Sequence, residues 1–311
     1  MDMLNAVFIA PFVDMVSYPV FFTEVVVSGL LTGVMYSLVA LGFVLIFKAS
    51  GVFNFAQGAM VLFAALTLVG LMERGVPVWA ALGLAVLVMV ALAFAIERFM
   101  LRYLINQEGI VLFMATIGLA FLLEGFGEMV WGSNVKPLDV GIPSESFEIG
   151  GVLLNEFDLY AAASGTVLVA VLAVFFHYTR IGRALRAVAD DHQAALSVGI
   201  PLKTIWIIVW SVAGFVGLVA GIMWGSKSGV QFSLSLIALK ALPVLILGGF
   251  TSIPGAIVGG LIIGVGEKIA EIYWGPLFGG AIENWFAYML ALAFLLFRPQ
   301  GLFGERIIER V

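Results

Sequence analysis

Long apolar runs separated by short polar segments make up most of the chain. A membrane-spanning helix needs about 20 mostly apolar residues, and nine runs approach or exceed this length. They are Val25–Phe47, Phe53–Leu71, Val78–Ile96, Ile110–Trp131, Leu159–Tyr178, Thr204–Trp224, Leu234–Phe250, Ala256–Ile272 and Ile282–Phe297. The runs do not alternate in segments of about ten residues, as strands of a membrane barrel would. We therefore expect an all-α polytopic membrane helix bundle of about eight to ten transmembrane helices, some short or broken, with residues 1–311 forming a single transmembrane domain.

The first 22 residues differ from the rest because they carry Asp2 and Asp14 but no Lys or Arg. They therefore lack the basic start of a cleavable signal peptide. Pro11 and Pro19 interrupt their apolar run. We expect a partly embedded segment that leads into the first span.

Composition supports a membrane protein and argues against an enzyme. The chain is 62% hydrophobic and 11% charged, whereas soluble domains are about 45–50% apolar and about 25% charged. Cysteine is absent and only two histidines occur, so we expect no disulfide and no metal. The sequence contains no nucleotide-binding P-loop, serine-hydrolase elbow or zinc-protease motif. We expect no catalytic residue and no nucleic-acid partner.

The distribution of Lys and Arg predicts the orientation. With the C-terminus in the cytoplasm, one side of the membrane carries Lys48, Arg98, Arg102, Arg180, Arg183, Arg186, Lys203, Arg298, Arg306 and Arg310. The other side carries only Arg74, Lys136 and Lys227. Because basic residues accumulate in cytoplasmic loops, residues 179–203 form a cytoplasmic loop and the acidic residues 132–158 form an external one.

The cytoplasmic loop is the most informative polar segment. Arginines open it, Asp190 and Asp191 lie in its middle, and Gly199 and Pro201 close it. The pattern predicts an amphipathic helix over Ala184–Val198, which suits docking onto a cytoplasmic partner. Its apolar side chains offered for burial are Leu185, Val188, Ala189, Ala195 and Leu196. The alternative is an ordinary helix that lies on the membrane surface.

Glycines recur at intervals of four residues. Gly217, Gly221 and Gly225 share one helix face, and the pairs Gly29/Gly33 and Gly260/Gly264 repeat the spacing. Small residues at this spacing let membrane helices approach closely. They indicate either fixed internal packing or faces that slide during function.

Two groups of polar residues lie at membrane depth, where they are costly. Asn54, Gln57 and Gly58 follow a break at residues 48–51, and the three-residue spacing places Asn54 and Gln57 on one helix face. These amides either line a solute path, as broken helices do in transporters, or form an interhelical hydrogen bond.

The second group contains Lys240 in one span and Glu267, Lys268 and Glu271 in the next. An ion pair inside the membrane would reduce the desolvation cost of both charges; alternatively the side chains extend to the interface. The glycine-rich segment between them predicts a tight cytoplasmic turn, with Thr251 or Ser252 capping the following helix.

Three blocks carry a resemblance to a known family: GVFNFAQGAM (51–60), YTRIGRALRAVADDHQAALSVGI (178–200) and KALPVLILGGFTSIPGAIVGGLIIG (240–264), with FRPQGLFG (297–304) also fitting. The chain resembles the permease subunit of ABC importers of the branched-chain amino acid family. The resemblance implies that the cytoplasmic loop couples to an ATPase through Gly182, Arg183, Arg186, Ala187, Asp190, Asp191, Ala194, Ala195 and Gly199. The candidates for the substrate path are Asn54, Gln57, Gly58, Lys240, Gly248 and Gly249.

The resemblance also implies partners. They are a second homologous permease subunit, two cytoplasmic ATPase subunits that bind ATP and magnesium, an external solute-binding protein, and the bacterial inner membrane. The family's first block usually carries His-Gly-Glu, where this chain has Gln57, Gly58 and Ala59. Branched-chain amino acids are the default solute; urea, amides and aromatic or other carboxylates are alternatives. A stand-alone secondary transporter or channel is the alternative of another class, although it leaves the long cytoplasmic loop unexplained.

Overall fold

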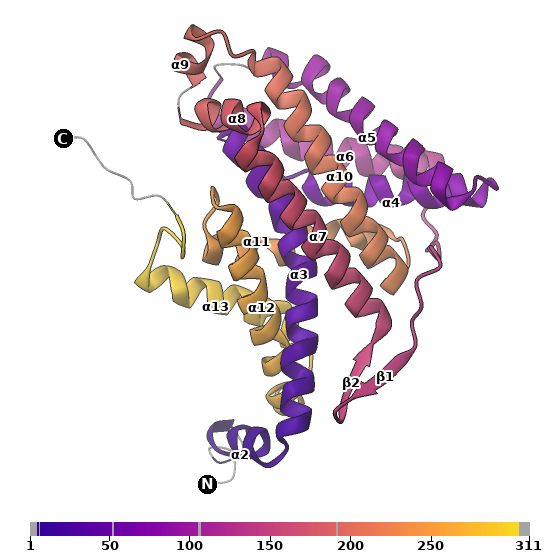
Figure 1. Cartoon of the computed structure of the whole chain (residues 1–311), viewed down its shortest axis with the longest axis vertical. Coiled ribbons are helices and arrows are strands. Elements are labelled where there is room, and N and C mark those ends of the chain that lie inside the picture. Colours follow the sequence, from indigo (N-terminus) through magenta and orange to yellow (C-terminus); the bar gives the residue numbers. More distant parts are fainter. Residues whose placement is uncertain (1–4, 6, 52, 105–106, 191, 305–311) are drawn as a thin grey trace. The chain divides into compact units, whose positions relative to one another are not determined.

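The computed structural model describes residues 5, 7–51, 53–104, 107–190 and 192–304, and helices dominate them (Figure 1). Asp2, Asp191, Arg306 and Arg310, named above, lie outside the described residues. The helices are α2 (Ala10–Ser17), α3 (Pro19–Ser50), α4 (Gln57–Glu73), α5 (Val78–Phe99), α6 (Gly109–Trp131), α7 (Glu156–Tyr178), α8 (Arg180–Asp190), α9 (His192–Ser197), α10 (Leu202–Ser228), α11 (Ile237–Gly248), α12 (Ile253–Tyr273) and α13 (Glu283–Phe297). Short 3₁₀ turns cover Leu101–Tyr103, Phe232–Leu236 and Gly275–Leu277. An antiparallel hairpin of β1 (Ser146–Ile149) and β2 (Val152–Asn155) lies in the acidic loop.

Every predicted span coincides with an apolar helix. Among the described residues, six helical segments are long and apolar enough to cross a membrane, and three shorter apolar ones accompany them. The shorter ones are Gln57–Glu73, Phe232–Gly248 and Glu283–Phe297. The chain is thus a multi-pass membrane protein, which confirms the predicted fold class.

The first long helix starts earlier than the hydropathy pattern predicts. Pro19 is the first residue of α3 and Pro11 lies in the first turn of α2. Proline fits the start of a helix because the first backbone N–H groups need no intrahelical acceptor. Pro19 therefore begins a helix where the sequence suggested an interruption.

The chain divides into two compact units, each discontinuous in sequence. Unit 1 comprises Met1–Ser37, Gly141–Thr166 and Lys240–Val311, and unit 2 comprises Leu38–Val140 and Val167–Leu239. The single transmembrane domain expected from the sequence stays a prediction.

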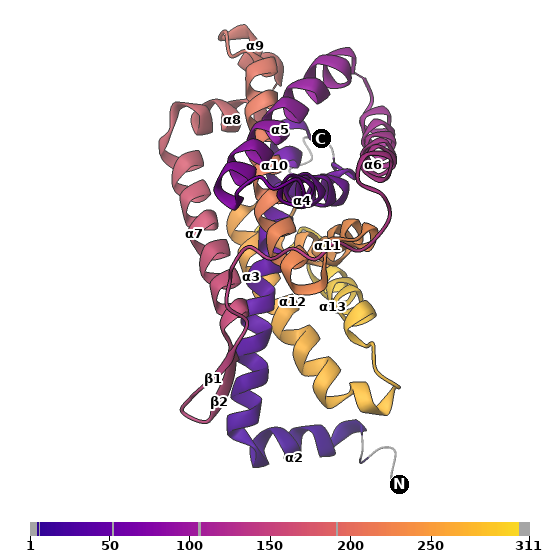
Figure 2. The same cartoon turned by 90° about the vertical axis from the view of Figure 1, so that its right-hand side faces the viewer.

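Unit 2 is built around α4. All of its residues from Gln57 to Gly70 are buried, and α5, α6 and α10 pack against it (Figure 2). A helix that is apolar on every side is stable only when it is covered on every side. Gly217 and Gly221 of the α10 stripe face α4, since a Cβ added at Gly221 would lie 2.7 Å from the carbonyl oxygen of Val61. Gly225 packs instead against Val230 and Leu138.

Unit 1 contains a second glycine contact, which we call the α3–α12 seam. A Cβ added at Gly33 would lie 2.6 Å from the carbonyl oxygen of Gly260, and one at Gly29 would lie 2.7 Å from Cα of Val265. Gly264 faces Gly29 and Gly33 in turn. The two glycine pairs noted in the sequence therefore pack against each other, backbone to backbone.

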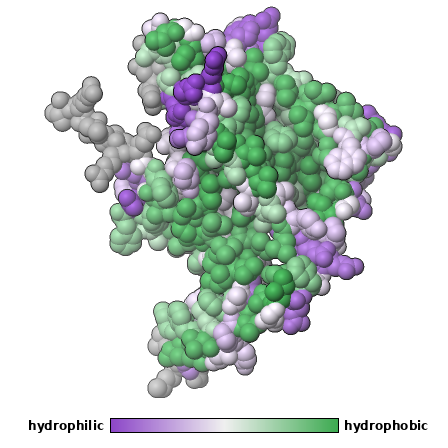
Figure 3. Space-filling view, in the orientation of Figure 1, coloured by the Kyte–Doolittle hydropathy of each residue, from purple (hydrophilic) through white to green (hydrophobic). Residues whose placement is uncertain are grey.

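Large apolar side chains also cover the outside of the helices. Trp79, Leu87 and Phe94 on α5, and Phe121 and Met129 on α6, are exposed. Figure 3 shows hydrophobic residues over most of one face, with hydrophilic residues gathered over α8. Such an apolar surface suits contact with lipid chains.

Candidate functional site

The break between α3 and α4 contains the first candidate group. Asn54 lies in a non-helical segment, where its Oδ1 accepts a hydrogen bond of 3.1 Å from the backbone N–H of Ala56. Asparagine favours such local bonds over helix formation, so α4 begins only at Gln57. The prediction that Asn54 and Gln57 share a helix face is therefore wrong, although both residues are fully buried.

A residue of α6 holds this break in place. The hydroxyl of Thr116 accepts a hydrogen bond of 3.0 Å from the backbone N–H of Phe55 and lies 3.4 Å from the carbonyl oxygen of Phe53. No sequence pattern pointed to Thr116. Its one available signal was a hydroxyl residue, buried in the structure, in the half of its span that lacks Glu124 and Glu128.

Gln57 is enclosed by its neighbours in unit 2. Its Nε2 donates to the carbonyl oxygen of Ala213 on α10, at 3.4 Å, and its Oε1 has no hydrogen-bond partner among the described residues. Gly42 on α3 makes room for the amide, and Gly58 packs against the backbone of Ser235. An unpaired buried acceptor destabilises the fold and calls for an explanation, which keeps Gln57 a candidate for solute contact.

Unit 1 contains a charged group, which we call the Glu267 cluster: Tyr36, Lys240, Glu267, Lys268 and Glu283. Oε1 of Glu267 accepts hydrogen bonds from Lys240 Nζ at 3.0 Å and from the Tyr36 hydroxyl at 3.2 Å. Lys240 also lies 3.6 Å from a carboxylate oxygen of Glu283, and Lys268 lies 4.0 Å from the other. Lys240 and Glu267 thus form an ion pair, as the first of the two alternatives predicted, whereas its position inside the membrane stays a prediction.

Glu271 lies one helical turn further along α12 and has different hydrogen-bond partners. Its two carboxylate oxygens accept hydrogen bonds from the backbone N–H groups of Ala281, at 3.0 Å, and Glu283, at 2.9 Å. It therefore fixes the loop that leads into α13 and satisfies an N–H group at the start of that helix. The sequence analysis missed Tyr36 and Glu283, which are distant in sequence from Lys240.

Gly248 and Gly249 form the turn between α11 and α12. Gly249 has a φ of 103°, which favours glycine, and Gly248 packs against the backbone of Gly255. Ser252 caps α12 by accepting a hydrogen bond from Gly255 N at 3.0 Å, as predicted.

Residues near the C-terminus cover this turn. The N–H groups of Leu302 and Phe303 donate to the carbonyl oxygens of Leu247, at 2.8 Å, and Gly248, at 3.1 Å. Close backbone contacts therefore explain why glycine occupies positions 248 and 249. Lys240 lies near the other end of α11, with the Glu267 cluster.

The loop of residues 179–203 forms two helices, α8 and α9, where one was expected over Ala184–Val198. Gly182 packs on the last turn of α7, and Arg186 donates to the carbonyl oxygens of Phe176, at 2.6 Å, and His177, at 3.4 Å. Such bonds satisfy carbonyls that a helix end leaves free. Arg186 thus anchors α8 to α7.

The apolar residues of this loop divide into an inner and an outer set. Leu185, Val188 and Ala195 are buried within unit 2, whereas Leu196 and Val198 are exposed. The expectation that the first three are offered to a partner is therefore wrong, because the chain itself covers them. Among the predicted coupling residues, Arg183, Ala194 and Gly199 are exposed and Ala187 is half-buried. Asp190 ends α8.

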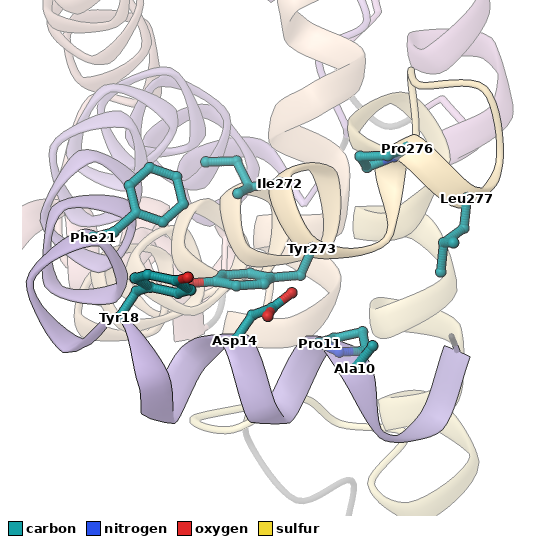
Figure 4. Close-up of a pocket in the computed structure, with 9 residues that line it drawn as sticks. All are labelled: Ala10, Pro11, Asp14, Tyr18, Phe21, Ile272, Tyr273, Pro276 and Leu277. Carbon is teal, nitrogen blue, oxygen red and sulfur yellow. The ribbon is translucent and has the colours of Figure 1, made fainter. Parts of the chain in front are cut away.

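A pocket of about 390 Å³ lies in unit 1 between α2 and the end of α12. Figure 4 shows Asp14 and Tyr18 on the α2 side facing Tyr273. The Tyr273 hydroxyl is buried and has no hydrogen-bond partner within the described part of the chain. None of the predicted path residues lines this pocket.

Comparisons with known proteins agree with the predicted transport role. The profile of a family described as "Branched-chain amino acid transport system / permease component" matches residues 25–298. BraD of Pseudomonas aeruginosa, a high-affinity branched-chain amino acid transport system permease protein, is 28% identical over 93% of this chain and 98% of its own length. LivH of Escherichia coli K12, which carries the same description, is 26% identical over 94% and 98%.

More distant similarities also occur. The fructose import permease protein FruG of Bifidobacterium longum is 22% identical over 80% of this chain and 74% of its own length. Among solved structures, PsaBC from Streptococcus pneumoniae in complex with Fab is 14% identical, with a TM-score of 0.44 over 93% of this chain and 94% of that one. A structural similarity with a TM-score of 0.44 supports no conclusion about this chain.

Proposed function

The chain belongs to the family of permease components of branched-chain amino acid transport systems, and from this membership we propose that it carries a branched-chain amino acid across the membrane. The observation that supports this best is the family match itself, which reaches every helix long enough to cross the membrane. As a permease of an ABC importer, the chain forms half of a translocation path. The relatives named for branched-chain amino acids match over nearly their whole length, which favours this solute over urea, amides or other carboxylates.

Energy for transport comes, in this proposal, from separate subunits. Two cytoplasmic ATPases bind ATP and magnesium, a second permease completes the path, and an external binding protein delivers the solute. The chain itself is not an enzyme. It lies in the bacterial inner membrane with its C-terminus in the cytoplasm, as the distribution of basic residues favours.

The contact with the ATPases is assigned to the outer surface of α8 and α9. Arg183, Ala194, Leu196, Val198 and Gly199 are exposed there. Two exposed apolar side chains, together with an exposed arginine, suit the hydrophobic core and polar rim of a protein interface. Leu185 and Val188 are buried and hold α8 against the rest of unit 2.

Replacing Gly199 tests this assignment. Its φ of 84° favours glycine or asparagine and excludes β-branched residues. We expect Gly199→Val to abolish ATP-coupled uptake in proteoliposomes while the protein still inserts, and Gly199→Asn to retain it. Reversal of the charges at Asp190 and Asp191 should also abolish uptake. Unchanged uptake in these variants would remove the docking role from this segment.

Purification of the tagged protein in mild detergent, followed by mass spectrometry, tests the whole proposal. We expect an ATPase pair and a second permease to co-purify, and leucine, isoleucine or valine uptake after reconstitution with the binding protein. A lone membrane protein, repeatedly free of any ATPase, would instead indicate a secondary transporter or channel.

A further inference from the structure

The Glu267 cluster joins four helices of unit 1 through charged side chains. Tyr36 belongs to α3, Lys240 to α11, Glu267 and Lys268 to α12, and Glu283 to α13. Glu267 is only 2% exposed, whereas the side chains of Lys240, Lys268 and Glu283 are 28%, 33% and 36% exposed. The cluster therefore has a buried end at Glu267 and an accessible end at the other three residues.

Positive and negative charges balance within the cluster, because the carboxylates of Glu267 and Glu283 accompany the ammonium groups of Lys240 and Lys268. Glu271 adds a third carboxylate next to Glu283. Both oxygens of Glu271 are occupied by backbone N–H groups. Both hydrogen bonds to Glu267 reach Oε1, and its Oε2 is buried without a hydrogen-bond partner among the described residues.

Packing alone gives a poor account of this arrangement. A buried ion pair is often no more stabilising than apolar residues of the same volume, because both charges must be desolvated. A buried carboxylate oxygen without a donor adds a further cost. Ionisable groups at membrane depth mark solute or ion pathways in many membrane proteins.

We propose that the Glu267 cluster binds the two charged groups of a zwitterionic α-amino acid during transport. Glu267 and Glu283 take the ammonium group, which supplies the donor that Oε2 lacks, and Lys240 and Lys268 take the carboxylate. This inference rests on the proposed transport function and identifies where the solute's charges are bound.

The alternation of positive and negative groups in the cluster distinguishes between solute classes. Urea and simple amides carry no charge to pair with these two carboxylates and two ammonium groups. A carboxylate without an ammonium group would leave Oε2 of Glu267 without a cationic donor. A zwitterion presents both signs on adjacent atoms, which matches alternating carboxylates and ammonium groups about 3 to 4 Å apart.

Exchanging the two charges of the buried pair separates recognition from packing. The experiment compares Lys240→Glu, Glu267→Lys and the double exchange, each assembled with the partner subunits and reconstituted in proteoliposomes. The readouts are co-purification with the partners and the rate of radiolabelled leucine uptake. We expect each single variant to lose at least tenfold in uptake. We expect the double exchange to assemble, because it retains an ion pair, yet to stay at least tenfold below the native protein.

The opposite result would overturn the proposal. If the double exchange restores uptake to at least half the native rate, then the pair only holds the helices together. Failure of the proposed function is distinguishable, since in that case the native complex itself takes up no branched-chain amino acid.

A second variant avoids the buried position in case the exchange does not assemble. Glu283→Gln changes a half-exposed residue, and we expect it to lower the number of leucine molecules taken up per ATP hydrolysed at least threefold. Glu128→Gln, an exposed carboxylate on α6, is the matched control. A ratio for Glu283→Gln equal to that of the control overturns the proposal.

Discussion

Glu267 and Glu271 lie one helical turn apart on α12, yet their carboxylates have unrelated partners. Glu267 pairs with Lys240 and Tyr36, and Glu271 binds backbone N–H groups of the loop before α13. The four-residue spacing predicts that they share a face. It cannot show that Tyr36 approaches from 231 positions away along the chain.

Glu271→Ala tests the anchoring of the loop. We expect the loss of two backbone hydrogen bonds to reduce stability by about 1–3 kcal/mol, because Ala281 and Glu283 would lose their acceptors. Thermal unfolding in detergent, followed by tryptophan fluorescence, should show a lower midpoint. Glu271→Gln keeps one acceptor oxygen and should lose less. An unchanged midpoint for Glu271→Ala would mean that the loop needs no anchor.

Gln57→Ala tests the buried amide of unit 2. The substitution removes the unpaired Oε1 and the hydrogen bond to Ala213. We expect a changed uptake rate or a changed preference among leucine, isoleucine and valine, measured in the reconstituted complex. If the variant takes up all three amino acids with native kinetics, then Gln57 serves packing and does not contact the solute.

At the scale of the helices, spacing predicted the kind of contact but not the partner. Gly29 and Gly33 indicated close approach, and only the structure shows that they meet α12. Hydropathy located α4 but placed its start four residues early, because an apolar run conceals the local hydrogen bonds of Asn54. The amphipathic pattern of residues 184–198 cannot reveal that unit 2 itself covers Leu185 and Val188.

Gly33→Ala tests the α3–α12 seam. The added methyl group would meet the backbone of Gly260, and overpacking of this kind costs about 1–3 kcal/mol. We expect a lower unfolding midpoint and reduced uptake. Gly83→Ala on α5 is the control, because nothing lies within 4 Å of the added group. It should be neutral or stabilising by up to about 1 kcal/mol, given the helix propensity of alanine.

At the scale of the whole molecule, hydropathy was sufficient to find the nine long or shorter apolar helices among the described residues, because each must present an apolar surface to lipid or to its neighbours. No comparable pattern in the sequence predicted the division into two compact units. Unit 1 joins residues 1–37 to residues 240–311, and contacts between segments so far apart leave no periodic pattern in the sequence.

The orientation of the whole chain can be measured directly, because the protein contains no cysteine. Single variants Glu148→Cys in the β1–β2 hairpin and Ala194→Cys in α9 place one thiol at an exposed position in each loop. We expect a membrane-impermeant maleimide to label the first on spheroplasts and the second only after the membrane is opened. The reverse result would invert the predicted topology.

The hydrogen bonds that Leu302 and Phe303 donate to the α11–α12 turn have a consequence for when unit 1 can fold during translation. The carbonyl groups of Leu247 and Gly248 receive their donors from Leu302 and Phe303, which the ribosome adds more than fifty residues later. At about 5–20 residues per second, the end of α11 lacks these two donors for several seconds after it is made. Unit 1 can therefore reach its native form only after Leu302 and Phe303 have been translated, and a chain truncated before them leaves the two carbonyl groups without these donors.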